Sequence, residues 1–185
     1  MDKNTLRQQM IEKRQSMVED DVRSLSKTVQ ERLMKSSLWP KSGRVGLYSP
    51  VKNEVMTQTL FQISLEQGLH VYYPRVEQGI LFYEVNGPED LQRGSWSILE
   101  PQRHCHGLEK GKNLDLLIVP GIVFTKDFYR IGYGKGFYDE FMGNNTDQIP
   151  TIGLAYEYQM VDSIQNDDWD QRLSAVITDR NIYQR

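Results

Sequence analysis

The run Leu114–Val119 (LDLLIV) constrains the fold more than any other segment, because all but one of its residues are apolar. A short run of this kind is typical of a strand that is covered on both faces, as in the interior of a parallel sheet. Similar short runs predict further strands. These lie at Arg44–Ser49, His70–Tyr73, Ile80–Val85, Thr151–Ala155 and Ala175–Thr178.

Helical patterns precede and separate these strands. Residues 1–37 predict helix, with Asp2 or Asn4 as the cap at its start. Apolar residues recur there at helical spacing in two stretches, which comprise Leu6, Met10 and Ile11, and then Val22, Leu25, Val29, Leu33 and Met34. Further helices are expected at Thr57–Glu66 and from Phe137 to Met142. The alternation predicts an α/β fold with a mainly parallel sheet, in which ligands bind at the carboxyl ends of the strands.

Length and composition restrict the class of protein. The 185 residues predict one domain spanning 1–185, and the formal charge of −3 argues against a large nucleic-acid-binding surface. No apolar stretch is long enough to span a membrane, and the charged N-terminal segment does not match a secretory signal. The single cysteine fits a reducing compartment. We therefore expect a cytoplasmic protein that binds neither nucleic acid nor membrane.

The segment Pro120–Met142 has the strongest functional signal. It follows the most apolar strand and carries Gly132, Gly134 and Gly136 at alternate positions. Lys135 lies between two of these glycines, and a helix is expected directly after them. Glycines let backbone amides approach an anion closely, so this pattern favours a phosphate-binding loop. A surface turn with a solvated lysine fits the same residues.

Two familiar phosphate motifs do not match this segment. A Walker A loop would require glycine at position 129, which is Tyr129, and Ser or Thr at position 136, which is Gly136. A dinucleotide-binding fingerprint would require glycine at Phe137. Asp139, about one helical turn beyond the glycines, has the chemistry of a Mg²⁺ ligand, although it also fits a helix-start carboxylate.

Other segments give weaker signals. Glu54, in the loop after the first strand, is suited to accept hydrogen bonds from an amidine-like ring edge, or it is an exposed loop charge. Lys3 and Arg7 lie on one helix face, which a solvated basic surface also explains. His104-Cys105-His106 is not expected to bind zinc, because adjacent extended residues point apart and no other cysteine is present.

The quoted segments resemble the 5-formyltetrahydrofolate cyclo-ligases, also called 5,10-methenyltetrahydrofolate synthetases. The similarity covers nearly the whole chain, and its most specific part is DLLIVPGIVFTKDFYRIGYGKGFYDEFM. It also includes KNTLR, YSPVKNEVMT, IGLAYEYQMVD and AVITD. The resemblance implies a three-layer α/β sandwich of the sugar-isomerase and CoA-transferase-like (NagB/RpiA/CoA transferase-like) group. It also implies ATP- and Mg²⁺-dependent conversion of 5-formyltetrahydrofolate to 5,10-methenyltetrahydrofolate. We expect the protein to be a monomer.

The resemblance assigns roles by position. Arg130 and Lys135 are expected to be catalytic, Asp139 to hold Mg²⁺, and Ser49, Glu54, Trp96 and Tyr138 to contact the folate. The residues expected to contact ATP are Lys3, Asn4, Thr5, Leu6, Arg7, Arg130, Ile131, Gly132, Tyr133, Gly134, Lys135, Gly136, Phe137 and Tyr138.

Two departures from the family pattern bear on the assignment. Met56 replaces a residue that is often acidic, and Ser174 stands where many members have an aspartate proposed as a second metal ligand. A folate- or nucleotide-binding module without turnover therefore stays an alternative. A sugar-phosphate isomerase with Glu54 as its base is a third reading.

Overall fold

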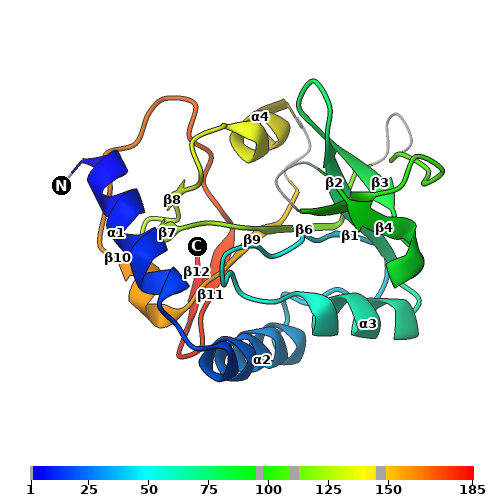
Figure 1. Ribbon diagram of the computed structural model, residues 1–185, viewed down its shortest axis with the longest axis horizontal. Coiled ribbons are helices and arrows are strands. Elements are labelled where there is room, and N and C mark those ends of the chain that lie inside the picture. The colour runs from blue at the N-terminus through cyan, green and yellow to red at the C-terminus, as the bar shows by residue number, and fades with distance from the viewer. Residues whose placement is uncertain (1, 95–97, 109–112, 145–148) are drawn as a thin grey trace.

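The computed structural model describes residues 2–94, 98–108, 113–144 and 149–185, and it is built around one large sheet (Figure 1). The sheet has seven strands in the order β12-β11-β9-β6-β1-β2-β3. Their bounds are β1 Arg44–Gly46, β2 His70–Val76, β3 Ile80–Glu84, β6 Leu116–Val119, β9 Thr151–Leu154, β11 Ala175–Ile177 and β12 Ile182–Gln184. The inner strands pair in parallel, and the edge strands β12 and β3 pair antiparallel. The expected mainly parallel sheet is confirmed.

Helices cover both faces of this sheet. α2 (Glu19–Lys35) and α3 (Gln58–Glu66) lie on one face, and α4 (Phe137–Asn144) lies on the other (Figure 1). Val29 and Leu33 of α2 and Leu60 of α3 are completely buried in one apolar cluster with the sheet. Fully burying a side chain of this size stabilises the fold by about 1.5–3 kcal/mol. Amphipathic helices therefore hold the sheet from both sides.

α1 (Lys3–Gln15) packs against a separate small sheet. This sheet has the order β10-β7-β8, and its strands are β7 Val123–Thr125, β8 Arg130–Ile131 and β10 Met160–Val161. Met10 of α1 shares an apolar cluster with Ile122, Val123 and Ile131. The Asp2 carboxylate accepts hydrogen bonds from the backbone N–H groups of Asn4 and Thr5, which makes Asp2 the cap and the alternative cap Asn4 wrong.

Short strands depart most from the sequence-based expectation. β4 (Leu91–Arg93), β5 (Leu99–Pro101), β7, β8, β10 and β12 have two or three residues each and were not predicted. The expected strand Arg44–Ser49 ends at Gly46, although the Leu47 N–H still donates to the Tyr72 carbonyl at 2.8 Å. Two 3-10 turns, η1 (Pro88–Asp90) and η3 (Glu157–Gln159), complete the described elements. None of the helices in the described ranges is long and apolar enough to cross a membrane.

The strand order reverses between β1 and β6. The chain leaves β1 toward β2 on one side, whereas β9 and β11 lie beyond β6 on the other side. The loops that follow β1 and β6 therefore diverge at the carboxyl edge of the sheet, and such a reversal point is where open α/β sheets bind ligands. The Glu54 loop and the glycine segment both begin at this point.

Candidate active site

Arg14 is the central contact of the site, although no local motif marks it. Its side chain is completely buried. Nε donates to the Lys52 carbonyl at 2.9 Å, Nη1 donates to the Gly121 carbonyl at 3.0 Å, and Nη2 donates to the Tyr133 hydroxyl at 2.6 Å. Nη2 also lies 3.7 Å from Oε1 of Glu54. One arginine of α1 thus contacts the loop after β1, the turn after β6 and the glycine segment.

Local backbone geometry turns Glu54 inward. Lys52 and Asn53 have φ values of 48° and 59°, the left-handed region that is uncommon for residues other than glycine. Nδ2 of Asn53 donates to the carbonyls of Arg14 and Met17, which ties the loop to the end of α1. Oε2 of Glu54 accepts from the Val51 N–H at 3.0 Å. The loop therefore holds the carboxylate in the interior rather than in solvent.

Glu54 is a buried carboxyl group with a raised pKa. Its side chain is 4% exposed, and burial raises its pKa to about 7, against the opposing charge of Arg14. Its Oε1 atom is buried and makes no hydrogen bond of normal geometry among the described residues, although the Tyr133 hydroxyl lies near enough to lower the pKa of the carboxyl. Buried oxygens are normally paired, so an open acceptor on a carboxylate with a raised pKa marks a candidate binding site. The reading of Glu54 as an exposed loop charge is wrong.

The glycine segment forms an exposed loop that leads into α4. Gly134 and Gly136 have φ values of 88° and 70°, which glycine adopts without strain. Arg7 of α1 donates from Nε to the Gly132 carbonyl at 2.8 Å. Lys135 lies at the exposed tip of the loop. The structure thus brings Arg7 of α1 to the glycine loop.

Arg130 and Asp139 close the base of this loop. The Arg130 side chain is 4% exposed, and its Nη2 atom lies 3.2 Å from Oδ2 of Asp139. Its Nε atom is buried without a hydrogen-bond partner in the described part of the chain. Burial lowers the pKa of the guanidinium, while the Asp139 charge raises it. A buried arginine with an open donor beside a glycine loop is suited to bind a phosphate oxygen.

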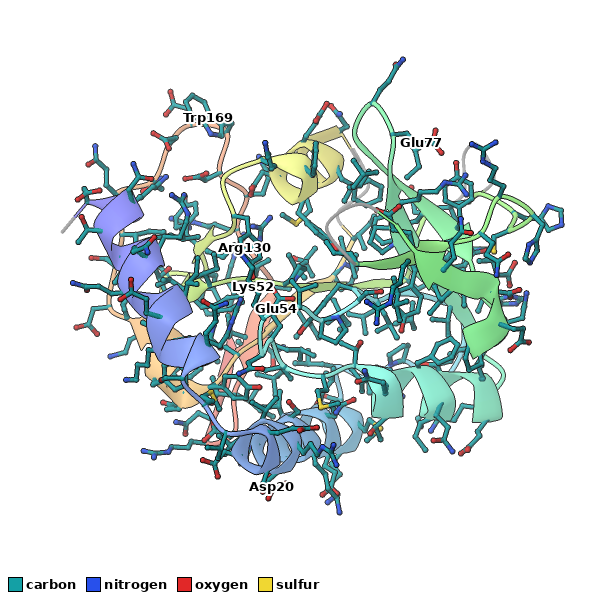
Figure 2. All side chains as sticks on the ribbon, viewed as in Figure 1. Asp20, Lys52, Glu54, Glu77, Arg130 and Trp169 are labelled. Carbon is teal, nitrogen blue, oxygen red and sulfur yellow. The ribbon has the colours of Figure 1, made fainter. Side chains whose placement is uncertain are left out.

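Tyr138 is an aromatic neighbour of Arg130. The Arg130 guanidinium lies 5.6 Å from the ring centroid of Tyr138. Burial and the charge of Glu54 both raise the pKa of the Tyr138 hydroxyl, which places Tyr138 within electrostatic range of Glu54 as well. Figure 2 shows Glu54, Lys52 and Arg130 in the central part of the molecule, whereas Trp169 lies at its rim.

Several other candidate site residues make hydrogen bonds or ion pairs within the protein. The Ser49 hydroxyl is buried and donates to the Leu99 carbonyl at 2.6 Å. Lys3 pairs with Asp167 and Asp170, at 2.7 Å from each. Ser174 accepts from the Thr151 N–H at 3.1 Å, at the start of β9, whereas Asp139 accepts from the Gln171 N–H. Trp96 lies outside the described residues.

Sequence reasoning also missed a cluster at His104. Asp90, His104 and Cys105 place their potential metal-ligand atoms within 4.8 Å of one another, because η1 brings Asp90 to the turn after β5. Nε2 of His104 lies 2.9 Å from the Asp90 carboxylate, so an ion pair accounts for the contact when the imidazole is protonated. The sequence around His104 and Cys105 does not show that the side chain of Asp90 lies beside them.

Comparisons with known proteins agree with the geometry. Residues 1–179 match the profile of the 5-formyltetrahydrofolate cyclo-ligase family. The chain is 31% identical to a 5-formyltetrahydrofolate cyclo-ligase from Mycoplasma pneumoniae over 97% of this chain and 99% of the relative.

Two solved structures that resemble this fold are 5,10-methenyltetrahydrofolate synthetases. The NMR structure of 5,10-methenyltetrahydrofolate synthetase from Aquifex aeolicus superimposes with a TM-score of 0.87 at 31% identity, covering 100% of this chain and 93% of that one. A synthetase from Mycoplasma pneumoniae superimposes with a TM-score of 0.77 at 29% identity, covering 97% of this chain and 99% of that one. The resemblance drawn from the sequence is confirmed, and the chain belongs to the 5-formyltetrahydrofolate cyclo-ligase family.

Proposed function

We propose that this protein converts 5-formyltetrahydrofolate to 5,10-methenyltetrahydrofolate while hydrolysing ATP to ADP and phosphate. The observation that carries the proposal is a pair of buried polar atoms without hydrogen bonds of normal geometry, one on the loop after β1 and one in β8. Oε1 of Glu54 is an open acceptor, and Nε of Arg130 is an open donor. The first suits the N–H groups of a folate ring edge, and the second suits a phosphate oxygen.

The reaction requires positioning more than protein nucleophiles. The formyl oxygen attacks the γ-phosphorus of ATP, the bond to the β-phosphate oxygen breaks, and ADP leaves. The neighbouring folate amine then attacks the activated formyl carbon, and phosphate leaves as the ring closes. Phosphoryl transfer of this kind depends on alignment and charge neutralisation. Buried cations and loop amides supply both without a covalent enzyme intermediate.

Two segments form the proposed nucleotide site. The first turn of α1, from Lys3 to Arg7, contacts ATP, and the segment Arg130–Tyr138 encloses its phosphates. The hydrogen bond from Arg7 to the Gly132 carbonyl supports this arrangement, because it joins the two segments. Exposed Lys135 reaches the γ-phosphate, and buried Arg130 stabilises charge that develops during transfer.

Asp139 is the proposed Mg²⁺ ligand. Its side chain is 16% exposed and offers carboxylate oxygen, the donor that Mg²⁺ prefers. Both of its oxygens already accept from Arg130 and Gln171, and each keeps a further lone pair. When bound, the cation supplies neutralisation of phosphate charge. Arg130 would bind the phosphates directly, and Asp139 would bind them through the cation.

The folate site lies on the loop after β1. Glu54 accepts from the pterin edge, and Ser49 and Tyr138 shape the adjoining surface, with Trp96 kept as a proposed contact. The charges of Glu54 and Arg130 both act on the Tyr138 hydroxyl, which supports a position of Tyr138 between the two substrates.

We assign the fold to the NagB/RpiA/CoA transferase-like group, as one cyclo-ligase domain over residues 1–185. The helices on both faces of the mainly parallel sheet support this assignment. We further propose a cytoplasmic monomer that acts on small molecules, in line with its nearly balanced charge.

The deciding experiment mixes purified protein with 5-formyltetrahydrofolate, Mg²⁺ and ATP and follows the near-ultraviolet absorbance of the methenyl product. Product is expected only when ATP is present, in a one-to-one ratio with ADP. Binding of folate without product at any ATP concentration would identify a binding module. An isomerase would act on its own substrate without ATP.

A further inference from the structure

Arg14 has contacts that the reaction just described does not use. It lies on α1 seven residues after Arg7, so both side chains project near the same helix face. Arg7 binds the glycine loop through the Gly132 carbonyl, and Arg14 binds the next residue through the Tyr133 hydroxyl. The helix is therefore joined to the loop at two successive residues.

The other contacts of Arg14 reach the folate side. Its Nε atom holds the Lys52 carbonyl, and its Nη2 atom faces Glu54 at 3.7 Å. That separation is longer than a hydrogen bond, so Glu54 acts on Arg14 through its charge, and the Tyr133 hydroxyl is the other group near the carboxylate. Nη2 of Arg14 thus lies between the Tyr133 hydroxyl of the glycine loop and the Glu54 carboxylate, which we assign to the folate site.

Tyr133 is the side chain through which the loop is anchored. It is 41% exposed, and its ring lies 5.4 Å from the Lys52 ammonium and 6.0 Å from the Arg14 guanidinium. Glycines flank it on both sides, and Gly134 is in the left-handed region. A loop with so little backbone restriction depends on its side-chain contacts for a defined position.

We propose that Arg14 is a positioning residue that couples the two substrate sites through Tyr133 and Glu54. This inference rests on the proposed function. Nη2 of Arg14 faces both the Tyr133 hydroxyl and Glu54. A folate that engages Glu54 takes up part of the carboxylate charge, so Nη2 donates more strongly to Tyr133 and holds the glycine loop in the geometry that ATP requires. ATP that orders the loop strengthens the same hydrogen bond. Each ligand therefore increases the affinity for the other, by the same factor in both directions.

The test measures this factor without turnover. The dissociation constant of a non-hydrolysable ATP analogue is determined by calorimetry with Mg²⁺, in the absence and presence of saturating 5-formyltetrahydrofolate. The reciprocal titration checks thermodynamic consistency. Wild-type protein is expected to show a coupling factor of about five-fold or more, the lower end for coupled sites.

The informative variant is Tyr133→Phe, which removes the hydroxyl that accepts from Arg14 and lowers the pKa of Glu54, while both members of the buried charge pair remain in place. Its coupling factor is expected to fall to about one, with a smaller change in the affinity for each ligand alone. Arg14→Lys keeps the charge but loses the planar fork, and it should also lose coupling. Tyr129→Phe is the matched control, because its ring lies against Arg172 rather than Arg14, and it should keep the wild-type factor.

The outcomes separate this inference from the proposed function. Product formation by wild-type protein with a coupling factor of one overturns the inference alone, as does a wild-type factor in Tyr133→Phe. Failure of wild-type protein to bind either ligand overturns both. Equal loss of coupling in Tyr129→Phe would show that the effect is not specific to Arg14. Melting temperatures of all variants establish that each is folded.

Discussion

The Nη2 atom of Arg130 lies 3.2 Å from the carboxylate of Asp139, nine residues further along the chain. This contact spans the glycine loop, with Arg130 at its start in β8 and Asp139 in the first turn of α4. It sets the distance between the two ends of the loop, while residues 133–136 between them stay exposed. The loop is thus fixed at its base and open toward a ligand.

Asp139→Asn tests this arrangement. It removes the carboxylate charge beside the proposed cation, an interaction of about 1–4 kcal/mol at a partly exposed position. The Mg²⁺ concentration for half-maximal rate should rise roughly ten-fold or more. Unfolding should also become easier by about 1–3 kcal/mol, because the buried Arg130 donor loses its charged partner. Steady-state Mg²⁺ titration and urea denaturation measure the two effects.

The control for Asp139→Asn is Glu140→Gln, which removes the same charge one residue later, on the exposed side of α4. Its Mg²⁺ titration should match that of wild-type protein. Superimposable titrations for Asp139→Asn and wild type would place the cation elsewhere.

Lys135→Ala should remain folded and be nearly inactive. An exposed loop lysine contributes little to stability, so the melting temperature should stay within a few degrees of wild type. Loss of one electrostatic donor to the transferring phosphoryl group typically costs about 2.7–4 kcal/mol, or a hundred- to a thousand-fold in turnover. Folate binding without ATP should change little. Near-normal turnover would mean that the glycine segment is only a turn.

The features that were predictable from the sequence are those whose signal is local. The four residues of β6 are all buried, as the apolar run predicted, and the glycine loop followed from its own spacing. β7 and β8 were missed because strands of two or three residues have no usable periodicity, and pairing between distant segments decides where they form.

Arg14 shows why part of the site could not be predicted. Its partners Lys52 and Tyr133 lie 38 and 119 residues away, and a helix arginine is ordinarily solvated. A signal was nevertheless present, because Lys3, Arg7 and Arg14 recur at the spacing of the face that also carries apolar Met10. A cation on such a face indicates a buried partner, but only the fold identifies it as Glu54.

Glu54→Gln separates folate recognition from ATP binding. Loss of a charge-assisted hydrogen bond should raise the folate Michaelis constant by an amount equivalent to about 1.5–3 kcal/mol, with a smaller change for ATP. The measurement is a two-substrate kinetic matrix at constant Mg²⁺. Exposed Glu12→Gln on α1 is the charge-matched control. An unchanged folate constant would remove Glu54 from the site.

The raised pKa of Glu54 also predicts a pH effect on stability. Its pKa is about 7 in the folded protein and near 4.5 as the ordinary value, so the folded state binds more protons between these limits. Stability relative to Glu54→Gln should be highest below about pH 4.5 and fall as the pH rises through 7, by at most about 3 kcal/mol. Urea denaturation of both proteins from pH 5 to pH 8 measures this difference. A difference that grows with pH would contradict burial as the cause.

Gly134→Ala separates the backbone requirement of the glycine loop from its effect on stability. At φ of 88° a Cβ atom adds strain of roughly 1–2 kcal/mol, and it would lie 3.6 Å from Nη2 of Arg7. The loop should shift, and the Michaelis constant for ATP should rise roughly ten-fold. Gly68→Ala is the matched control, because Gly68 has φ of 74° at the end of α3 and no atom within 4 Å of the added Cβ. Both variants should lose similar stability in urea denaturation, and only Gly134→Ala should lose ATP affinity. Equal ATP constants in the two variants would show that the loop backbone does not contact the nucleotide.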